Sequence, residues 1–487
     1  ANKYLGPESY AIIYKREGKD PDEQKIAAPK ITPIVTNRDS QSEFLSEIQT
    51  SQVQPIEPVF VDYKKDMSQF EAQPGIDVLY KKNETNDIFT LIYVFNTGTE
   101  NDPALNLAFN YLSYLGTDKM TAEEIASEMY DIACSFYMNA GANQSSIQIT
   151  GLSENMGKAM EIVEGLIAGA KPDEAILENL KGDMLKSRAD AKLNQSRCFG
   201  ALQRYLFYGG DFIRRTTLTD PALQALTSEQ LLAKIGGLMG KQHEVLYYGP
   251  QKETEIKSAL AEHHKVAADL QPLEKKFSAL LPTDANKVVL AQYDAKQLYY
   301  LQFSNRGEKF DVAADPEITL YNEYFGGGMN TIVFQEMREA RGLAYSAWAT
   351  LATPSNANGD YSYYAFIATQ NDKMQKAVEA FDDIINNMPE SEKAFGIAKE
   401  ALVSRLRTER TVKDGVLWSY LRARDLGLDA PRDKQIFEKV QSMTLDDVKA
   451  AQQKWVKGRK YVYGILGDIQ DLDLNYLKTL GPIQTVS

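Results

Sequence analysis

The sequence predicts an α+β fold of two homologous domains, each a mostly antiparallel sheet covered on one face by helices, and three observations support this prediction. Short segments rich in β-branched and aromatic residues alternate with longer amphipathic segments. Strand and helix signals follow in the same order in both parts of the chain. Matching residues recur at a spacing of 217 or 218: Met156 and Met374, Pro172 and Pro389, Gly249 and Gly467. This spacing indicates a duplicated domain, because solenoid repeats have periods of about 20 to 50 residues.

The duplication sets the domain boundaries. We expect residues 58–270 and 287–487 to form the two domains and residues 271–286 to connect them. In the first domain, apolar alternation predicts strands at residues 76–80, 89–95, 145–150 and 245–249. Apolar periodicity and start signals predict helices at residues 102–115, 122–132, 155–168, 228–238 and 252–264, and a long helix after Pro172.

The second domain repeats this order of elements. Its strands are expected at residues 288–293, 298–303, 361–367 and 461–467. Its helices are expected at residues 372–385 and after Pro389, where a second long helix begins.

The first 57 residues lie outside both predicted domains. Residues 18–57 are rich in proline, serine and glutamine, which predicts a linker with a short helix near residues 42–48. Residues 10–14 read as a single strand that resembles the last strand of each domain. Because one strand is not stable alone, we expect residues 1–17 to complete a preceding domain that this chain lacks.

A glycine-rich stretch at residues 325–346 organises the second domain. Three consecutive glycines, Gly326 to Gly328, allow a sharp turn or a close approach of another chain. A helix is expected from Met329, with one buried stripe formed by Met329, Ile332, Val333 and Met337. Gly342 suits the left-handed end of this helix, and a strand is expected at residues 343–349.

Arg338 and Tyr345 are the candidate catalytic residues. Arg338 lies near the end of the expected helix and Tyr345 near the start of the strand, so both should reach the same corner. A guanidinium and a phenol at one corner suit the polarisation of a peptide carbonyl. Taken singly, Arg338 is better explained as a surface arginine with a buried stem and Tyr345 as a core aromatic residue.

The run of residues 326–345 resembles the C-terminal signature of the pitrilysin/insulinase family, the inverted-motif zinc peptidases. The resemblance implies that an arginine and a tyrosine seven residues apart, as Arg338 and Tyr345 are, help to hold the substrate carbonyl opposite a zinc site in the other half. It implies that Gly326, Gly327 and Gly328 lie at the substrate. It also implies four homologous domains in full-length members, of which this chain holds the third and fourth.

The family binds zinc through His-x-x-Glu-His on a helix, which places three side chains on one face. The corresponding positions here hold Leu107, Asn110 and Tyr111. Leucine cannot ligate zinc, and asparagine cannot act as the general base for a zinc-bound water. We therefore expect no metal site and no cofactor in this chain, with zinc in the N-terminal half that is missing from it.

The three histidines of the chain have no partner at the spacing of the zinc motif. His263 and His264, next to Glu262, are expected at an exposed helix end, and His243 precedes an interior strand. None of the three is assigned to a metal.

Composition excludes several other classes of function. The net charge of −13 argues against nucleic-acid binding, which needs a basic face. No apolar run approaches the roughly 20 residues of a membrane span. The two cysteines, Cys134 and Cys198, predict no disulfide framework. The glycine-rich stretch lacks the Gly-Lys-Ser/Thr of a phosphate loop.

These observations predict the C-terminal half of a zinc metalloendopeptidase that degrades peptides or unfolded segments. Its partner would be the zinc-bearing half, either fused or a separate subunit, and this chain alone should be inactive. The alternative is a catalytically inert scaffold or peptide-binding subunit of the same fold, as in mitochondrial members of the family. The resemblance is closest to bacterial members, many of which are exported, so the bacterial periplasm is the candidate compartment.

Overall fold

The computed structural model describes residues 2–6, 8–14, 42–52 and 54–486, and the chain divides into two compact units. The first unit, residues 1–55, contains helices α1 (Asn2–Leu5) and α2 (Glu43–Thr50). Ser42 caps α2 because its side chain accepts a hydrogen bond from the N–H of Leu45. The short helix expected near residues 42–48 is therefore confirmed. Of the expected linker, residues 18–57, residues 18–41 and 53 lie outside the described residues.

Residues 10–14 form no strand in the described part of the first unit, and their side chains are exposed. The strand predicted there is therefore wrong for this structure. A strand needs a neighbour to pair with its backbone N–H and C=O groups, and a single one is not stable in water. The assignment of residues 1–17 to a preceding domain stays a prediction.

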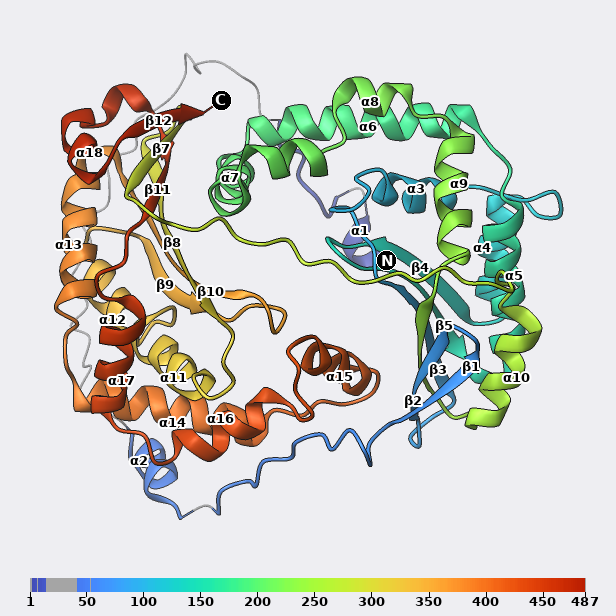
Figure 1. Cartoon of the computed structure of the whole chain (residues 1–487), viewed down its shortest axis with the longest axis horizontal. Helices are drawn as coiled ribbons and strands as arrows, with labels where there is room; N and C mark the ends of the chain where they lie inside the picture. Colours follow the sequence, from blue (N-terminus) through green and yellow to red (C-terminus); the bar gives the residue numbers. More distant parts are fainter. Residues whose placement is uncertain (1, 7, 15–41, 53, 487) are drawn as a thin grey trace. The chain divides into compact units, whose positions relative to one another are not determined.

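The second unit, residues 56–487, contains two six-stranded sheets (Figure 1). The first sheet has the strand order β1-β2-β6-β3-β5-β4. Strands β2 and β6 are parallel, and the other neighbours are antiparallel. The strands are β1 (Ser68–Gln73), β2 (Ile76–Lys82), β3 (Ile88–Phe95), β4 (Cys134–Ala140), β5 (Ser145–Leu152) and β6 (His243–Gly249).

The second sheet has the order β12-β7-β11-β8-β10-β9, which repeats the first from its second strand onwards. The edge strand differs: β12 comes from the C-terminus and runs parallel to β7, whereas β1 is antiparallel to β2. The strands are β7 (Lys287–Gln292), β8 (Gln297–Lys309), β9 (Ser346–Ala352), β10 (Asp360–Gln370), β11 (Val462–Gly467) and β12 (Ile483–Val486).

Each domain contributes helices, and all but α7 and α15 belong to the layer on one face of their own sheet. The first domain contributes α3 (Leu105–Leu112), α4 (Ala122–Asp131), α5 (Met156–Gly169), α6 (Glu174–Lys192), α7 (Gln195–Thr216), α8 (Asp220–Ala225), α9 (Ser228–Met239) and α10 (Glu253–His263). The second contributes α11 (Asp315–Phe325), α12 (Ile332–Phe334), α13 (Met374–Asn386), α14 (Glu392–Thr408), α15 (Gly415–Asp425), α16 (Arg432–Val440), α17 (Leu445–Ala451) and α18 (Leu474–Leu480).

The two domains repeat down to single hydrogen bonds. Asp173 caps α6 and Ser391 caps α14, at a spacing of 218 residues. In the first domain, the hydroxyl of Tyr111 accepts from the N–H of Asp173 at 2.7 Å. In the second, the hydroxyl of Tyr324 accepts from the N–H of Ser391 at 3.1 Å. The predicted duplication and the α+β class are thus confirmed.

The second face of each sheet is covered by a helix of the other domain, which the sequence did not predict. Helix α7 of the first domain packs on β7, β8 and β11, and α15 of the second packs on β2, β3 and β6 (Figure 1). Gly464 of β11 lets α7 approach, since a Cβ there would collide with Leu206. The contacting residues of α7 are Phe199, Leu202 and Leu206, and those of α15 are Val416, Leu417 and Leu421.

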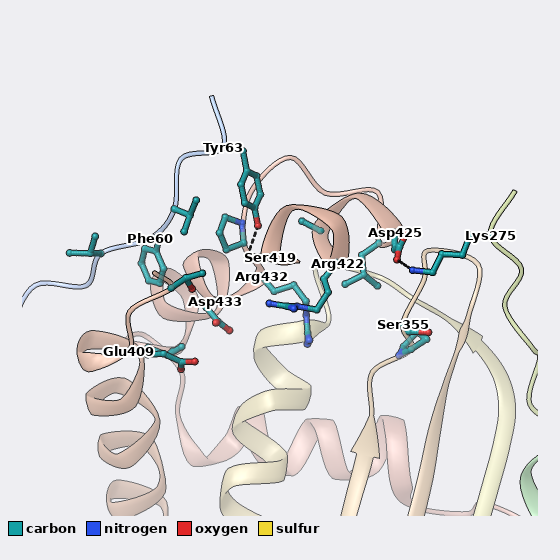
Figure 2. A pocket seen from close by; sticks show the side chains of 18 of the residues that line it. Phe60, Tyr63, Lys275, Ser355, Glu409, Ser419, Arg422, Asp425, Arg432 and Asp433 are labelled. Carbon is teal, nitrogen blue, oxygen red and sulfur yellow. Dashed lines mark hydrogen bonds and ion pairs between the residues drawn. The ribbon is translucent and has the colours of Figure 1, made fainter. Parts of the chain in front are cut away.

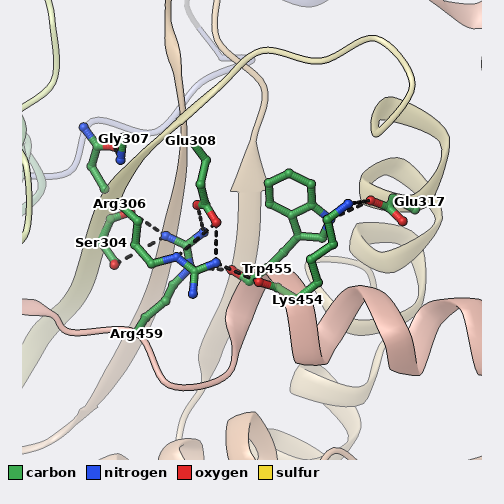
Figure 3. Close-up of polar contacts among 9 residues, drawn as sticks. Ser304, Arg306, Gly307, Glu308, Glu317, Lys454, Trp455 and Arg459 are labelled. Carbon is green, nitrogen blue, oxygen red and sulfur yellow. Dashed lines mark hydrogen bonds and ion pairs between the residues drawn. The ribbon is translucent and has the colours of Figure 1, made fainter.

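A buried arginine connects the C-terminal helices to the second sheet (Figure 3). The side chain of Arg459 is fully buried and pairs with Glu308 of β8 at 2.5 Å. Its Nε donates to the carbonyl of Trp455. Glu308 also pairs with the half-exposed Arg306, so one carboxylate holds two guanidinium groups. Burial lowers the pKa of Arg459, against the raising effect of Glu308.

Candidate functional site

The turn at the glycine-rich stretch is longer than the sequence predicts. Residues 326–331 form turns, and α12 begins only at Ile332. Ile332, Val333 and Met337 are buried as expected, but Met329 is 73% exposed, so its place in the buried stripe is wrong. The side chain of Thr331 bonds the carbonyl of Gly328 at 2.7 Å, which holds the chain in a turn before the helix.

The helix continues from α12 as a π-helix over Gln335–Ala340, and this segment carries Arg338. Single π-turns are frequent at functional sites because they redirect the side chains of a helix. Gly342 follows with a φ of +57°, the left-handed conformation predicted for this position. The chain then passes Tyr345 and enters β9 at Ser346.

Arg338 and Tyr345 meet at the corner predicted for them. The guanidinium carbon of Arg338 lies 4.7 Å from the ring centroid of Tyr345 and 5.0 Å from that of Phe334. Tyr345 is 73% exposed and the side chain of Arg338 is 39% exposed. Within the described residues, the Tyr345 hydroxyl has no hydrogen-bond partner, and the guanidinium has only Glu339, at 3.6 Å. Both polar groups are therefore available to a ligand, and Tyr345 is no core residue.

The three glycines occupy different environments. Gly326 is buried, and a Cβ added there would lie 2.5 Å from the carbonyl oxygen of Ala349 and 2.7 Å from that of Asn322. Gly327 is exposed, and a Cβ there would have no atom within 4 Å. Gly328 is also exposed. Gly326 is therefore required for the close passage of the turn over β9.

We expect Gly326→Ala to destabilise the second domain by about 1–3 kcal/mol, because the added methyl group forces two backbone segments apart. Gly327→Ala is the matched control and should change stability by less than about 0.5 kcal/mol. Urea unfolding followed by tryptophan fluorescence measures both, because Trp348, Trp418 and Trp455 all lie in this domain. Equal effects of the two substitutions would contradict the steric role of Gly326.

The positions that correspond to the zinc motif do not fit a metal. Leu107 and Tyr111 are buried in the core of the first domain, whereas Asn110 is exposed on the opposite side of α3. Tyr111 uses its hydroxyl to bind Asp173 and Ser228. Across the described residues, no group of three or more histidine, cysteine, aspartate and glutamate side chains is placed to hold a metal ion. In that part of the chain, no helix combines the length and apolar character needed to cross a membrane.

His264 is buried, so the exposed helix end predicted for it is wrong. Its side chain lies in the core because α10 packs against α5, where Glu164 is also buried. His264 Nδ1 is 2.5 Å from Glu164 Oε1, and His264 Nε2 is 2.8 Å from His243 Nε2. His243 Nδ1 is 2.8 Å from the carbonyl of Lys241.

The three contacts form one continuous hydrogen-bonded network. His243 donates from Nδ1 to the carbonyl of Lys241 and accepts at Nε2 from His264 Nε2, and one proton lies between His264 Nδ1 and the Glu164 carboxyl group. The ring centroid of Tyr93 lies 4.1 Å from that of His264, with the two rings tilted by 32°. Burial and the neighbouring His264 lower the pKa of His243 to about 4, so His243 is neutral near pH 7. These side chains form a hydrogen-bonded network in the core of the first domain and not a metal site.

A polar pocket of about 420 Å³ lies elsewhere in the second unit (Figure 2). Its charged groups are largely paired: Arg432 binds the buried Asp315 at 2.5 Å, and Lys275 binds Asp425 at 2.6 Å. Sequence reasoning missed this pocket because its walls come from five distant segments without a shared motif, near residues 59–63, 143, 275–277, 354–355 and 406–433. Neither Arg338 nor Tyr345 lines it.

A protein-family model described as the peptidase M16 inactive domain matches residues 243–402, which include Arg338 and Tyr345. An uncharacterized zinc protease of Streptomyces coelicolor is 23% identical over 266 residues, which cover 51% of this chain and 56% of that protein. The match thus spans just over half the length of this relative.

Solved structures of low sequence identity share the fold. The peptidase M16 inactive domain from Pseudomonas fluorescens superposes with a TM-score of 0.65 at 18% identity, over 82% of this chain and 98% of that one. The periplasmic protease PqqL from Escherichia coli superposes with a TM-score of 0.65 at 14% identity, over 90% of this chain and 49% of that one. The resemblance to the inverted-motif zinc peptidases is confirmed: residues 243–402 match the peptidase M16 inactive domain, and the chain has the fold of that domain.

Proposed function

We propose that this chain is the C-terminal, non-zinc-binding half of a zinc metalloendopeptidase that degrades peptides or unfolded segments. The observation that carries the proposal is the exposed pair of Arg338 and Tyr345, whose polar groups converge at one corner. An inert scaffold has no use for a guanidinium held over a phenol ring in contact with solvent.

In this proposal, the two side chains bind the carbonyl oxygen of the scissile peptide. The Tyr345 hydroxyl and the Arg338 guanidinium donate hydrogen bonds to that oxygen, whose negative charge grows as the carbonyl carbon becomes tetrahedral. Phe334 supports Arg338 from the same helix, which limits the orientations of the guanidinium. The N–H groups of the exposed residues Gly327 and Gly328 would bind the peptide backbone next to this corner, and Gly326 would hold the turn that carries them.

The partner in this proposal is a half that carries His-x-x-Glu-His, either fused to this chain or as a separate subunit. When bound there, zinc supplies an activated water as the nucleophile. The residues of this chain do not fit the metal, because Leu107 and Tyr111 are committed to the core of the first domain. Its own contribution is to position the peptide, stabilise charge on the carbonyl oxygen and exclude bulk water by closing over the site.

The test is hydrolysis of a fluorescence-quenched peptide by this chain alone, by a His-x-x-Glu-His-bearing half alone, and by the two together. We expect cleavage only from the mixture. If the mixture is silent although the two halves bind each other, the chain is a catalytically inert scaffold or a peptide-binding subunit. Cleavage by this chain alone, with stoichiometric zinc, would overturn the assignment of zinc to the other half.

A further inference from the structure

Strand β4 has an unpaired outer edge. Its one neighbour in the first sheet is β5, and the N–H of Gly141 donates to the carbonyl of Gln144 at 2.8 Å where the two strands join. Hydrogen bonds to β5 therefore fall on the odd-numbered residues of β4, and Phe136 and Met138 direct their backbone groups away from β5. Among the described residues, no backbone or side-chain group bonds to these outward groups of Phe136 and Met138.

The same edge is closed at two positions in the second domain, Ala349 and Leu351. The N–H of Ala349 in β9 donates to the carbonyl of Gly326 at 3.0 Å. The side chain of Asn322 accepts from the N–H of Leu351 and donates to its carbonyl, both at 2.9 Å. Thr150 and Ala368 are equivalent by the 218-residue spacing of the two domains, and they pair with Ser135 and Ser346. Counted along β4 and β9 from these two serines, Met138 corresponds to Ala349 and Ala140 to Leu351.

The difference has a definite cause in the sequence. Tyr111 and Tyr324 are equivalent because each binds the residue that caps the following long helix, and this places Phe109 at the position of Asn322. Phe109 is 1% exposed and packs in the core, and its hydrocarbon side chain has no group that can bond a strand edge. Asn322 therefore closes β9, whereas α3 leaves β4 open.

We propose that the outer edge of β4 binds an extended peptide segment, which adds to the first sheet as a further strand. The outward groups of β4 alternate with a period of two residues, which only another extended backbone can match. The solvent-facing side chains of β4 are uncharged, namely Ser135, Tyr137 and Asn139, and Tyr137 is 65% exposed. The edge therefore suits unfolded segments with uncharged side chains at alternate positions. The inference rests on strand pairing and does not depend on Arg338 or Tyr345.

The experiment uses the full chain without a zinc-bearing half, so its result is separate from peptide hydrolysis. The probe is a fluorescein-labelled ten-residue peptide in which valines alternate with threonines, and its control carries proline at three positions and cannot form a strand. Hydrogen exchange with mass spectrometry should show slower exchange in residues 133–141 when the first peptide is added. The proline-containing peptide should leave this exchange unchanged.

Phe136→Pro should weaken binding of the peptide at least tenfold in fluorescence anisotropy, because it removes an outward N–H and leaves the bonds to β5 intact. Phe136→Ala is the matched control: it removes the same side chain but keeps the N–H, and its affinity should stay within threefold of the unmodified chain. The proposal would be overturned if the peptide slowed hydrogen exchange at β9 in place of β4, or at neither strand. It would also be overturned if exchange at β4 slowed because the chain dimerises without peptide. These exchange results hold even if Phe136→Pro fails to fold.

Discussion

Arg338→Ala is expected to lower the peptidase activity of the two combined halves about 100-fold, which corresponds to the loss of one donor to the carbonyl oxygen in the transition state. The loss should fall on kcat more than on KM, because the interaction strengthens as charge develops on that oxygen. Arg338→Lys should recover only part of the activity, since an ammonium lacks the planar fork that stacks on Tyr345. Tyr345→Phe removes the hydroxyl and keeps the ring under Arg338, so a similar loss of kcat is expected.

Arg341 offers a matched control on the same turn of the chain. Its guanidinium pairs with Glu336 at 3.3 Å and with Asp383 at 3.1 Å on the surface of the second domain, so it is not part of the exposed pair of Arg338 and Tyr345. Arg341→Ala should change activity by less than about threefold, in line with the small energies of exposed ion pairs. Equal losses of activity in Arg338→Ala and Arg341→Ala would show that both arginines act through folding. They would contradict a carbonyl-binding role for Arg338.

The features that the sequence predicted are those that local pattern determines. The capping residues of α6 and α14 are also 218 residues apart, because a few neighbouring residues determine where a helix begins. The meeting of Arg338 and Tyr345 was predictable because only one turn, ended by Gly342, separates them. The helix start at Met329 was wrong because its spacing matched a buried stripe, and periodicity does not show where a glycine turn ends.

The features that the sequence did not predict depend on contacts between distant segments. His264 follows His263 at a helix end, and only the packing of α10 against α5 buries it beside Glu164. The exchange of α7 and α15 between domains leaves no local signal, because an apolar stripe shows that a helix is covered but not which sheet covers it. The open edge of β4 depends in part on one difference, Phe109 in place of Asn322, and the effect of that difference can be recognised only once the strand order is known.

The largest expected loss of stability comes from Arg459→Met. The substitution keeps most of the buried volume but removes the donor to the Trp455 carbonyl and one of the two cations on Glu308. Removing one partner of a buried ion pair typically costs about 3–5 kcal/mol. We expect the lower end, about 3 kcal/mol, because Arg306 still neutralises Glu308. The stability of Arg459→Lys should lie between that of the unmodified chain and that of Arg459→Met, since the lysine ammonium can reach one acceptor but cannot bridge two.

Lys454→Met is the matched control for this experiment. Lys454 pairs with Glu317 at 2.8 Å, but its side chain is 58% exposed, and Trp455 donates to the same carboxylate at 2.7 Å. Its removal should cost less than about 1 kcal/mol. The tryptophan transition in urea reports the second domain through Trp348 and Trp455, and Trp418 adds a signal from the contact of α15 with the first sheet. The midpoint for Arg459→Met should fall well below that of Lys454→Met. If the two midpoints coincide, Arg459 does not anchor the C-terminal helices to β8, and the second sheet is held by its apolar core alone.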